Sequence, residues 1–217
     1  MFLLKQYPEY IFNFEGAVKY AWMKEYYPAQ YEEMKKFIES GRWHISGASW
    51  DATDTLVPSI ESALRNIMLG QDYYRKEFGV ESTDIFLPDC FGFGWTLPAI
   101  ASHCGLIGFS SQKLQWRNKP FYGNDKYPFT VGLWQGIDGS TIMMTHGYDY
   151  NQRFEDGDLS ENKDLLELTG HSPLHMVYRY YGTGDIGGSP TLESVRAVEK
   201  GLQGNGPLPV SYTHLRA

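Results

Sequence analysis

Short apolar runs alternate along this chain with segments of helical periodicity, and this alternation constrains the fold more than any other feature. Each run is bounded by glycine, proline or aspartate, as is typical of strands. The runs lie at Ile85–Leu87, Leu106–Phe109, Val131–Trp134, Thr141–Thr145 and Met176–Tyr181. Strands that alternate with helices form βαβ units, so we expect an α/β fold with a mostly parallel sheet and flanking helices. The turn at Ile137–Ser140 predicts one hairpin inserted in that sheet.

Four segments are predicted as helices from the spacing of their apolar residues and from their end signals. The first follows Pro28 and ends before Gly41, the second runs from Ile60 towards Gly79, the third is capped by Thr96 and ends before Gly105, and the fourth opens at Ser189-Pro190 and reaches Gly201. A short strand is predicted at Trp43–Ile45. The polar, acidic stretch Asn151–Ser172 is predicted as a long exposed loop.

Charge and composition exclude several classes of function. The chain has 217 residues with 19 Lys+Arg against 26 Asp+Glu, and no basic cluster, which argues against a nucleic-acid partner. No apolar stretch approaches the roughly 20 residues of a membrane helix, so we expect a soluble chain without a membrane partner. The two cysteines, Cys90 and Cys104, form no CxxC pair, and we expect two reduced, partly buried thiols.

The segment Leu87–Trp95 carries the strongest chemical signal. It directly follows a predicted strand, and the loops at the carboxyl ends of parallel strands gather catalytic groups in α/β proteins. Pro88 and two glycines hold Asp89 on a tight turn among aromatic rings. A carboxylate held in this way suits a nucleophile or a metal ligand, while an aspartate that only caps the following helix is the simpler interpretation.

Two further loops present carboxylates. The glycine-rich segment Tyr181–Thr191 offers Asp185 as a general acid or a hydroxyl-binding group, although a turn aspartate explains the same pattern, and it lacks the Lys-Ser/Thr of a P-loop. In the second loop, Asp51 and Asp54 follow the indole of Trp50 in a composition that suits carbohydrate contact or a simple turn. The six histidines show no HxH or HExxH spacing, so no zinc site can be assembled from neighbouring ligands.

Taken together, these segments resemble glycoside hydrolase family 38, the retaining α-mannosidases. The colinear pattern comprises Phe12–Glu15, Tyr27-Pro28, Gly41–Trp43, Gly47–Trp50, Glu61-Ser62 with Arg65, Phe78–Val80, Leu87–Phe93, Leu97-Pro98, Gln112–Leu114, Trp134–Ser140 and Gly184-Asp185. The resemblance implies a partial (β/α)-barrel over residues 1–210, which would be a fragment of the catalytic domain. It also implies hydrolysis of terminal α-mannosides of an oligosaccharide or glycan through a glycosyl-enzyme intermediate.

The resemblance also implies roles for individual residues. Asp89 would be the nucleophile and a ligand of one divalent ion, usually zinc, and Phe91 would stack near the same sugar. Asp185 is the candidate acid/base, matched by order and glycine context. Trp50 and Lys113 are candidate substrate-binding residues. Lys113 would bring a positive charge near Asp89, although a solvated lysine explains it equally well.

The chain departs from the family pattern at both ends. The family's first metal-ligand motif, His-x-Asp, has no counterpart, and its remaining histidine ligand lies beyond residue 217. We therefore expect an internal fragment that is inactive alone and binds zinc weakly, with a non-native tail at Ser211–Ala217 in which His214 has no role. The alternatives are a carbohydrate-binding module without catalysis and a polysaccharide deacetylase, although the Asp-Asp pair of a deacetylase is not present.

Overall fold

The computed structural model describes residues 1–113, 130–146, 153–185 and 187–212. The chain divides into two compact units. The first contains Met1–Ser110 and Leu133–Met144, and the second contains Ser111–Gly132 and Thr145–Tyr212. None of the described helices is long and apolar enough to cross a membrane.

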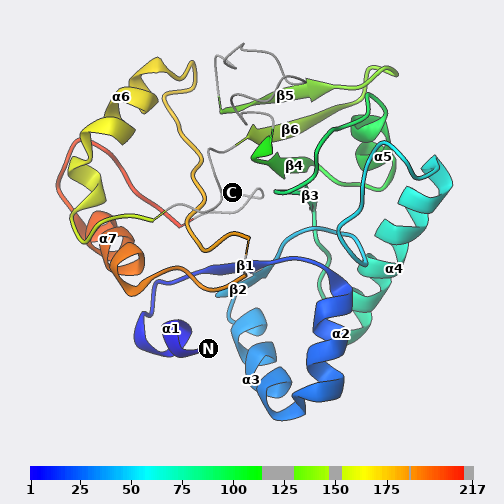
Figure 1. Ribbon diagram of the computed structural model, residues 1–217, viewed down its shortest axis with the longest axis horizontal. Coiled ribbons are helices and arrows are strands. Elements are labelled where there is room, and N and C mark those ends of the chain that lie inside the picture. The colour runs from blue at the N-terminus through cyan, green and yellow to red at the C-terminus, as the bar shows by residue number, and fades with distance from the viewer. Residues whose placement is uncertain (114–129, 147–152, 186, 213–217) are drawn as a thin grey trace. The chain divides into compact units, whose positions relative to one another are not determined.

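Two small sheets supply the strands, as Figure 1 shows. The strands are β1 (Phe12–Phe14), β2 (Trp43–Ile45), β3 (Asp84–Phe86), β4 (Gly108–Ser111), β5 (Val131–Gln135) and β6 (Thr141–His146). β1 and β2 form a parallel pair, and the larger sheet has the order β3-β4-β6-β5, in which β3 and β4 are parallel. The N–H of Gly136 donates to the carbonyl of Ser140 (2.8 Å) in the turn between β5 and β6. The mostly parallel sheet and its hairpin are therefore confirmed, while the partial barrel stays a prediction.

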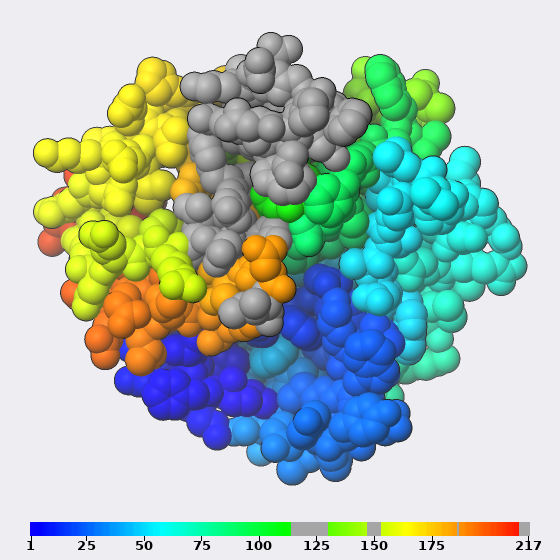
Figure 2. All heavy atoms as spheres, in the orientation of Figure 1, coloured from blue at the N-terminus to red at the C-terminus, as the bar shows by residue number. Residues whose placement is uncertain are grey.

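Helices flank these strands in the first unit. They are α1 (Phe2–Gln6), α2 (Ala17–Tyr26), α3 (Pro28–Glu39), α4 (Ile60–Phe78) and α5 (Leu97–His103). α3 and α4 confirm the sequence prediction, and α4 ends at Gly79 in the left-handed region (φ 68°), which favours glycine. The prediction that Thr96 caps α5 was wrong, because its side chain makes no capping hydrogen bond. α4 forms part of the surface seen in Figure 2. Met68 and Leu69 on this helix are about half exposed.

An aromatic cluster forms the core beside β1 and β2. The fully buried Tyr20 donates from its hydroxyl to the carbonyl of Phe14 (3.0 Å) and accepts from the indole N–H of Trp43 (3.0 Å). The rings of Tyr74 and Phe78 on α4 pack edge-on against Tyr20 at centroid distances of 5.8 and 5.5 Å. Because polar tips of buried rings are satisfied internally, this cluster fixes α2 and α4 against the strand pair.

The second unit has its own core. It contains a 3₁₀ helix η2 (Leu159–Glu161), α6 (Lys163–His171) and α7 (Leu192–Gln203). Its buried centre consists of Leu159, Ala197 and Val198. α7 was predicted to open at Ser189-Pro190, but it begins after Thr191. The hydroxyl of Thr191 caps the helix by accepting from the N–H of Ser194.

Two sequence predictions in the second unit were wrong. The predicted loop Asn151–Ser172 holds η2 and α6 in its described part, and Asn162 caps α6 by accepting from the N–H of Leu165 (2.9 Å). The predicted strand Met176–Tyr181 has no regular secondary structure. The Tyr181 side chain instead packs against the core centred on Leu159, so its apolar character serves packing rather than sheet formation.

Candidate active site

The candidate site in the first unit is built where its parallel strands end. Glu15 directly follows β1, and because β1 and β2 are parallel, the segment after β2 leaves from the same edge. The Gly47 and Ala48 N–H groups connect that segment to the start of β3, donating to the Asp84 carboxylate (3.0 Å) and carbonyl (2.8 Å). These bonds join the segment after β2 to the first residue of β3.

The Asp89 loop, residues 87–95, lies against the segment that follows β2. The hydroxyl of Thr55 donates to the carbonyl of Gly92 (2.7 Å), and the Cys90 thiol donates to the carbonyl of Thr53 (3.3 Å). Asp89 itself is exposed. The sequence prediction that this aspartate lies at the exit of a strand is therefore confirmed, with β3 as the strand, although no role for Asp89 follows from its position alone.

The aromatic residues of the Asp89 loop have different environments. Phe91 is 51% exposed and Trp95 is 80% exposed. Phe93 instead packs edge-on against Phe109 of β4, with ring centroids 4.9 Å apart. Phe91 and Trp95 are thus available to a sugar face, whereas Phe93 anchors the loop to the sheet.

Cys90 reports on the charges around the loop. Burial raises the pKa of the Cys90 thiol to about 11, and the negative charges of Asp54, Asp89 and Glu15 contribute to the increase. The negative charges of three carboxylates, each on a segment that follows a different strand, therefore raise the pKa of the same thiol. Cys90 and Cys104 are both free and half-buried, as the sequence predicted.

A lysine partly neutralises this acidic rim. The ammonium of Lys19 on α2 pairs with the Glu15 carboxylate and lies 3.6 Å from Oδ1 of Asp51. The Asp54 carboxylate accepts from the N–H groups of Leu56 (2.7 Å) and Val57 (3.0 Å), which is the turn role that the sequence left open for it. The half-buried Trp50 packs edge-on against Tyr73, with centroids 5.8 Å apart.

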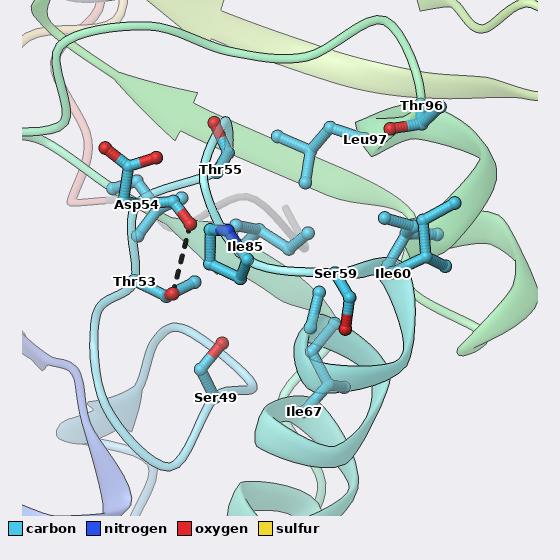
Figure 3. Close-up of a pocket in the computed structure, with 14 residues that line it drawn as sticks. Ser49, Thr53, Asp54, Thr55, Ser59, Ile60, Ile67, Ile85, Thr96 and Leu97 are labelled. Carbon is cyan, nitrogen blue, oxygen red and sulfur yellow. Dashed lines mark hydrogen bonds between the residues drawn. The ribbon is translucent and has the colours of Figure 1, made fainter.

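A cavity of about 50 Å³ is lined by residues of the segment that follows β2, of α4 and of α5 (Figure 3). Hydroxyl-bearing residues such as Thr53, Thr55 and Ser59 line its rim, and aliphatic residues such as Ile67 and Ile85 line its floor.

Asp185 and Lys113 belong to the second unit, so their positions relative to Asp89 stay predictions. Asp185 is exposed and has a left-handed backbone (φ 61°) in a loop where Thr183 donates from its hydroxyl to the carbonyl of Ser189 (3.0 Å). Lys113 is buried, at 6% exposure. Its burial is inconsistent with the solvated lysine that the sequence left open. Leu114, Ile186 and His214 lie outside the described residues, as does most of the predicted tail.

The described residues do not assemble a metal centre. No group of three or more His, Cys, Asp or Glu side chains in residues 1–113, 130–146, 153–185 and 187–212 is placed to hold a metal ion. Asp89 is thus the one ligand among them that the family resemblance suggests. These residues do not by themselves fit a complete zinc centre.

Sequence reasoning missed two residues that shape the site, Asn66 and Gly70 of α4. Asn66 hydrogen-bonds the backbone of Asp51 in both directions, and Gly70 lies directly against the chain at Ala48–Trp50. A glycine in the middle of a strongly periodic helix was the available signal, since glycine disfavours helices and marks a close approach of another backbone.

The comparisons with known sequences agree on a single family. The model of the glycosyl hydrolases family 38 N-terminal domain matches residues 1–216. The chain is 36% identical over 196 residues to α-mannosidase G of Dictyostelium discoideum and 30% identical over 195 residues to human α-mannosidase 2C1. Each match covers 87% of this chain but 17% and 18% of the relative.

Solved structures agree at the level of the fold. A family 38 glycosyl hydrolase from Enterococcus faecalis superposes with a TM-score of 0.69 at 17% identity, covering 97% of this chain and 22% of that one. Similarity at this identity shows the fold alone. Together with the match along nearly the whole sequence, it leads to one conclusion: the chain belongs to the N-terminal domain of the family 38 glycosyl hydrolases.

Proposed function

We propose that this chain carries part of the active site of a retaining α-mannosidase, with Asp89 as the nucleophile. The observation that carries the proposal is the exposed Asp89 on a loop that follows β3, packs on the sheet through Phe93 and lies against the segment that follows β2. Family membership makes glycoside hydrolysis the relevant chemistry. The two relatives compared above bear the name α-mannosidase, which supports a terminal α-mannoside of a glycan as the substrate.

The proposed reaction has two steps. An Asp89 carboxylate oxygen attacks the anomeric carbon while the bond from that carbon to the leaving-group oxygen breaks, and a carboxylic acid, for which Asp185 is the candidate, protonates that oxygen. The same acid, now a carboxylate, then takes a proton from water as the water displaces Asp89. Two carboxyl groups about 5–5.5 Å apart are required for retention. Trp50 and Phe91 would offer aromatic faces to the sugar ring, and Lys113 would bring a positive charge near Asp89.

The family resemblance adds one divalent ion, zinc, with Asp89 among its ligands. Zinc bound there would polarise sugar hydroxyls as a Lewis acid. We propose that further ligands come from other parts of the polypeptide, so that the 217-residue chain is inactive alone.

The decisive experiment replaces Asp89 with Ala in a form of the protein that hydrolyses p-nitrophenyl α-mannoside. The rate should fall by about 10⁴-fold or more, because removing a covalent nucleophile removes the first step. Asp138 in the β5–β6 turn is the matched control. It is an exposed aspartate whose hydrogen bonds go to Ser140, and Asp138→Ala should keep the normal rate.

Azide distinguishes a nucleophile from a residue that only supports the fold. A small anion that enters the space left by the carboxylate should restore turnover of Asp89→Ala and yield a mannosyl azide of inverted configuration. A near-normal rate for Asp89→Ala, or no rescue by azide in a variant that still binds the substrate, would remove Asp89 from the nucleophile role.

A binding module without catalysis is the second candidate, and the exposure of Phe91 and Trp95 favours it. In that case α-mannosides bind, but no form of the protein releases p-nitrophenol. The deacetylase alternative predicts acetate rather than a reducing sugar as the product, so analysis of the products separates the three functions.

A further inference from the structure

α4 holds the segment Gly47–Asp51 through a matched pair of residues on one of its faces. Asn66 and Gly70 are one helical turn apart, so they lie on the same side of the helix. A Cβ atom at position 70 would lie 2.6 Å from the Trp50 nitrogen and closer still to the Ala48 carbonyl oxygen. Only glycine permits this approach, which brings the segment within hydrogen-bonding distance of Asn66.

Asn66 bonds the segment at three points. Its side-chain amide donates from Nδ2 to the carbonyl of Asp51 (2.9 Å) and accepts at Oδ1 from the N–H of Asp51 (3.2 Å). Its own carbonyl accepts from the N–H of Trp50 (2.8 Å). An uncharged amide has both a donor and an acceptor, so it can fix the peptide groups on both sides of Asp51 as a neighbouring strand would.

The rest of the segment is also fixed. The hydroxyl of Tyr74 donates to the carbonyl of Gly47 (3.2 Å), while the N–H groups of Ala17 and Val18 donate to the carbonyls of Ser49 (3.3 Å) and Trp50 (2.9 Å). Conformational freedom is thereby removed from a loop at a strand exit, where loops are ordinarily mobile. Of these bonds, those to the backbone of Asp51 come from a single side chain, that of Asn66.

The segment carries two groups suited to a sugar and leads directly to the Asp89 loop. The Trp50 ring rests on Tyr73, and the exposed Asp51 carboxylate lies near the Lys19 ammonium. Beyond Asp51 the chain reaches Thr53 and Thr55, which contact Cys90 and Gly92. The backbone at Trp50 is therefore fixed by bonds to both α2 and α4, and the backbone at Asp51 is fixed by its bonds to Asn66 of α4.

We propose that Asn66 is a positioning residue for α-mannoside binding, whose side-chain amide fixes Trp50 and Asp51 in the orientation in which they contact the sugar. This inference rests on the proposed function. Asn66 itself touches no substrate in this arrangement and acts through the backbone of Asp51.

The first test measures positioning without any ligand, by amide hydrogen exchange of the 217-residue chain. In Asn66→Ala the Asp51 N–H loses its acceptor, whereas the Trp50 N–H keeps its bond to the main-chain carbonyl of residue 66. We expect Asp51 to exchange about fivefold faster or more, with little change at Trp50. Unchanged exchange at Asp51 would overturn the role of Asn66 in holding the segment.

The second test measures p-nitrophenyl α-mannoside kinetics with the active form used above for Asp89. Asn66→Ala should raise KM about tenfold and leave kcat within about twofold, because the lost contacts bind the sugar without entering the chemistry. Asn66→Asp, which keeps the acceptor for the Asp51 N–H but loses the donor, should give an intermediate KM. Asp72→Ala is the control, since this partly exposed α4 residue pairs with Lys76 on the same helix.

The outcomes separate this inference from the proposed function. If Trp50→Ala raises KM and Asn66→Ala does not, the positioning role is overturned while the α-mannosidase proposal stands. If the two variants raise KM by similar factors and the double variant adds little more, the two residues act as one unit, as the inference requires. If the wild-type protein neither binds nor hydrolyses α-mannosides, the proposed function fails together with the sugar-binding part of this inference.

Discussion

Replacing Gly70 with Ala should destabilise the first unit, although alanine is the better helix former. In an ordinary helix interior this change gains about 1 kcal/mol. Here the added Cβ would meet main-chain atoms of Ala48, Ser49 and Trp50, and main-chain atoms cannot rotate away as the end of a flexible side chain can.

The expected loss of unfolding free energy follows from the displacement of the segment Ala48–Trp50 away from α4. Overpacking costs about 1–3 kcal/mol, and displacement of the segment weakens three hydrogen bonds to Asn66 worth about 1 kcal/mol each. Set against the gain in helix propensity, the net loss of unfolding free energy should be about 3 kcal/mol.

Urea unfolding followed by circular dichroism measures this loss. Gly170 of α6 is the matched control, because it is a helical glycine at which an added Cβ atom would meet nothing within 4 Å, and Gly170→Ala should stabilise by about 0.5 kcal/mol. If Gly70→Ala unfolds within about 0.5 kcal/mol of the wild type, the close approach on which the Asn66 inference depends is refuted.

Three further predictions concern ionisable groups and metal. Burial raises the pKa of Asp84 to about 6, so this residue contributes stability below about pH 4 that is lost as the pH rises through 6. We expect the free energy of unfolding of the wild type to fall by up to about 3 kcal/mol from this cause between about pH 4 and pH 7, and Asp84→Asn should remove that fall. If the free energy of unfolding of Asp84→Asn falls as much as that of the wild type over this range, burial of Asp84 is not the cause. The Cys90 thiol should react with Ellman's reagent at about pH 8 more than tenfold more slowly than free cysteine, because burial raises its pKa to about 11; a rate equal to that of free cysteine would show an open loop. Equilibrium dialysis should show that the chain binds zinc with a Kd above about 10 μM. Structural zinc sites with four ligands have binding free energies of about 10 kcal/mol or more, and the described residues lack such a set of ligands. Nanomolar binding would contradict this prediction.

Local signals explain which elements could be predicted. α4 has a serine cap at Ser59, a sustained apolar stripe and a terminal glycine, and each of these signals is a property of neighbouring residues. β1 and the segment Met176–Tyr181 both have strand-like composition, yet of the two only β1 is paired with a neighbouring strand in the described part of the chain. Pairing of that kind is decided by residues far away in the sequence, so composition alone could not separate the two.

The candidate site divides in the same way. Asp89 and the loop around it could be located because proline and two glycines follow an apolar run. Asn66 could not be found, since its partner Asp51 is brought to it by the packing of the segment after β2 against α4 and not by any motif. The contact of Lys19 with Asp51 was missed for the same reason, because it joins the segment after β1 to the segment after β2, two strands that pair in parallel.

The strand β5 has a practical consequence for work on the isolated polypeptide. It is the last strand in the order β3-β4-β6-β5 of the described residues, with Leu133 at 74% exposure, and the adjoining turn carries Ile137 at 68%. An edge strand with exposed apolar side chains can pair with the same strand of a second molecule and so begin aggregation. Each unfolding titration should therefore use dilute samples and include a light-scattering control.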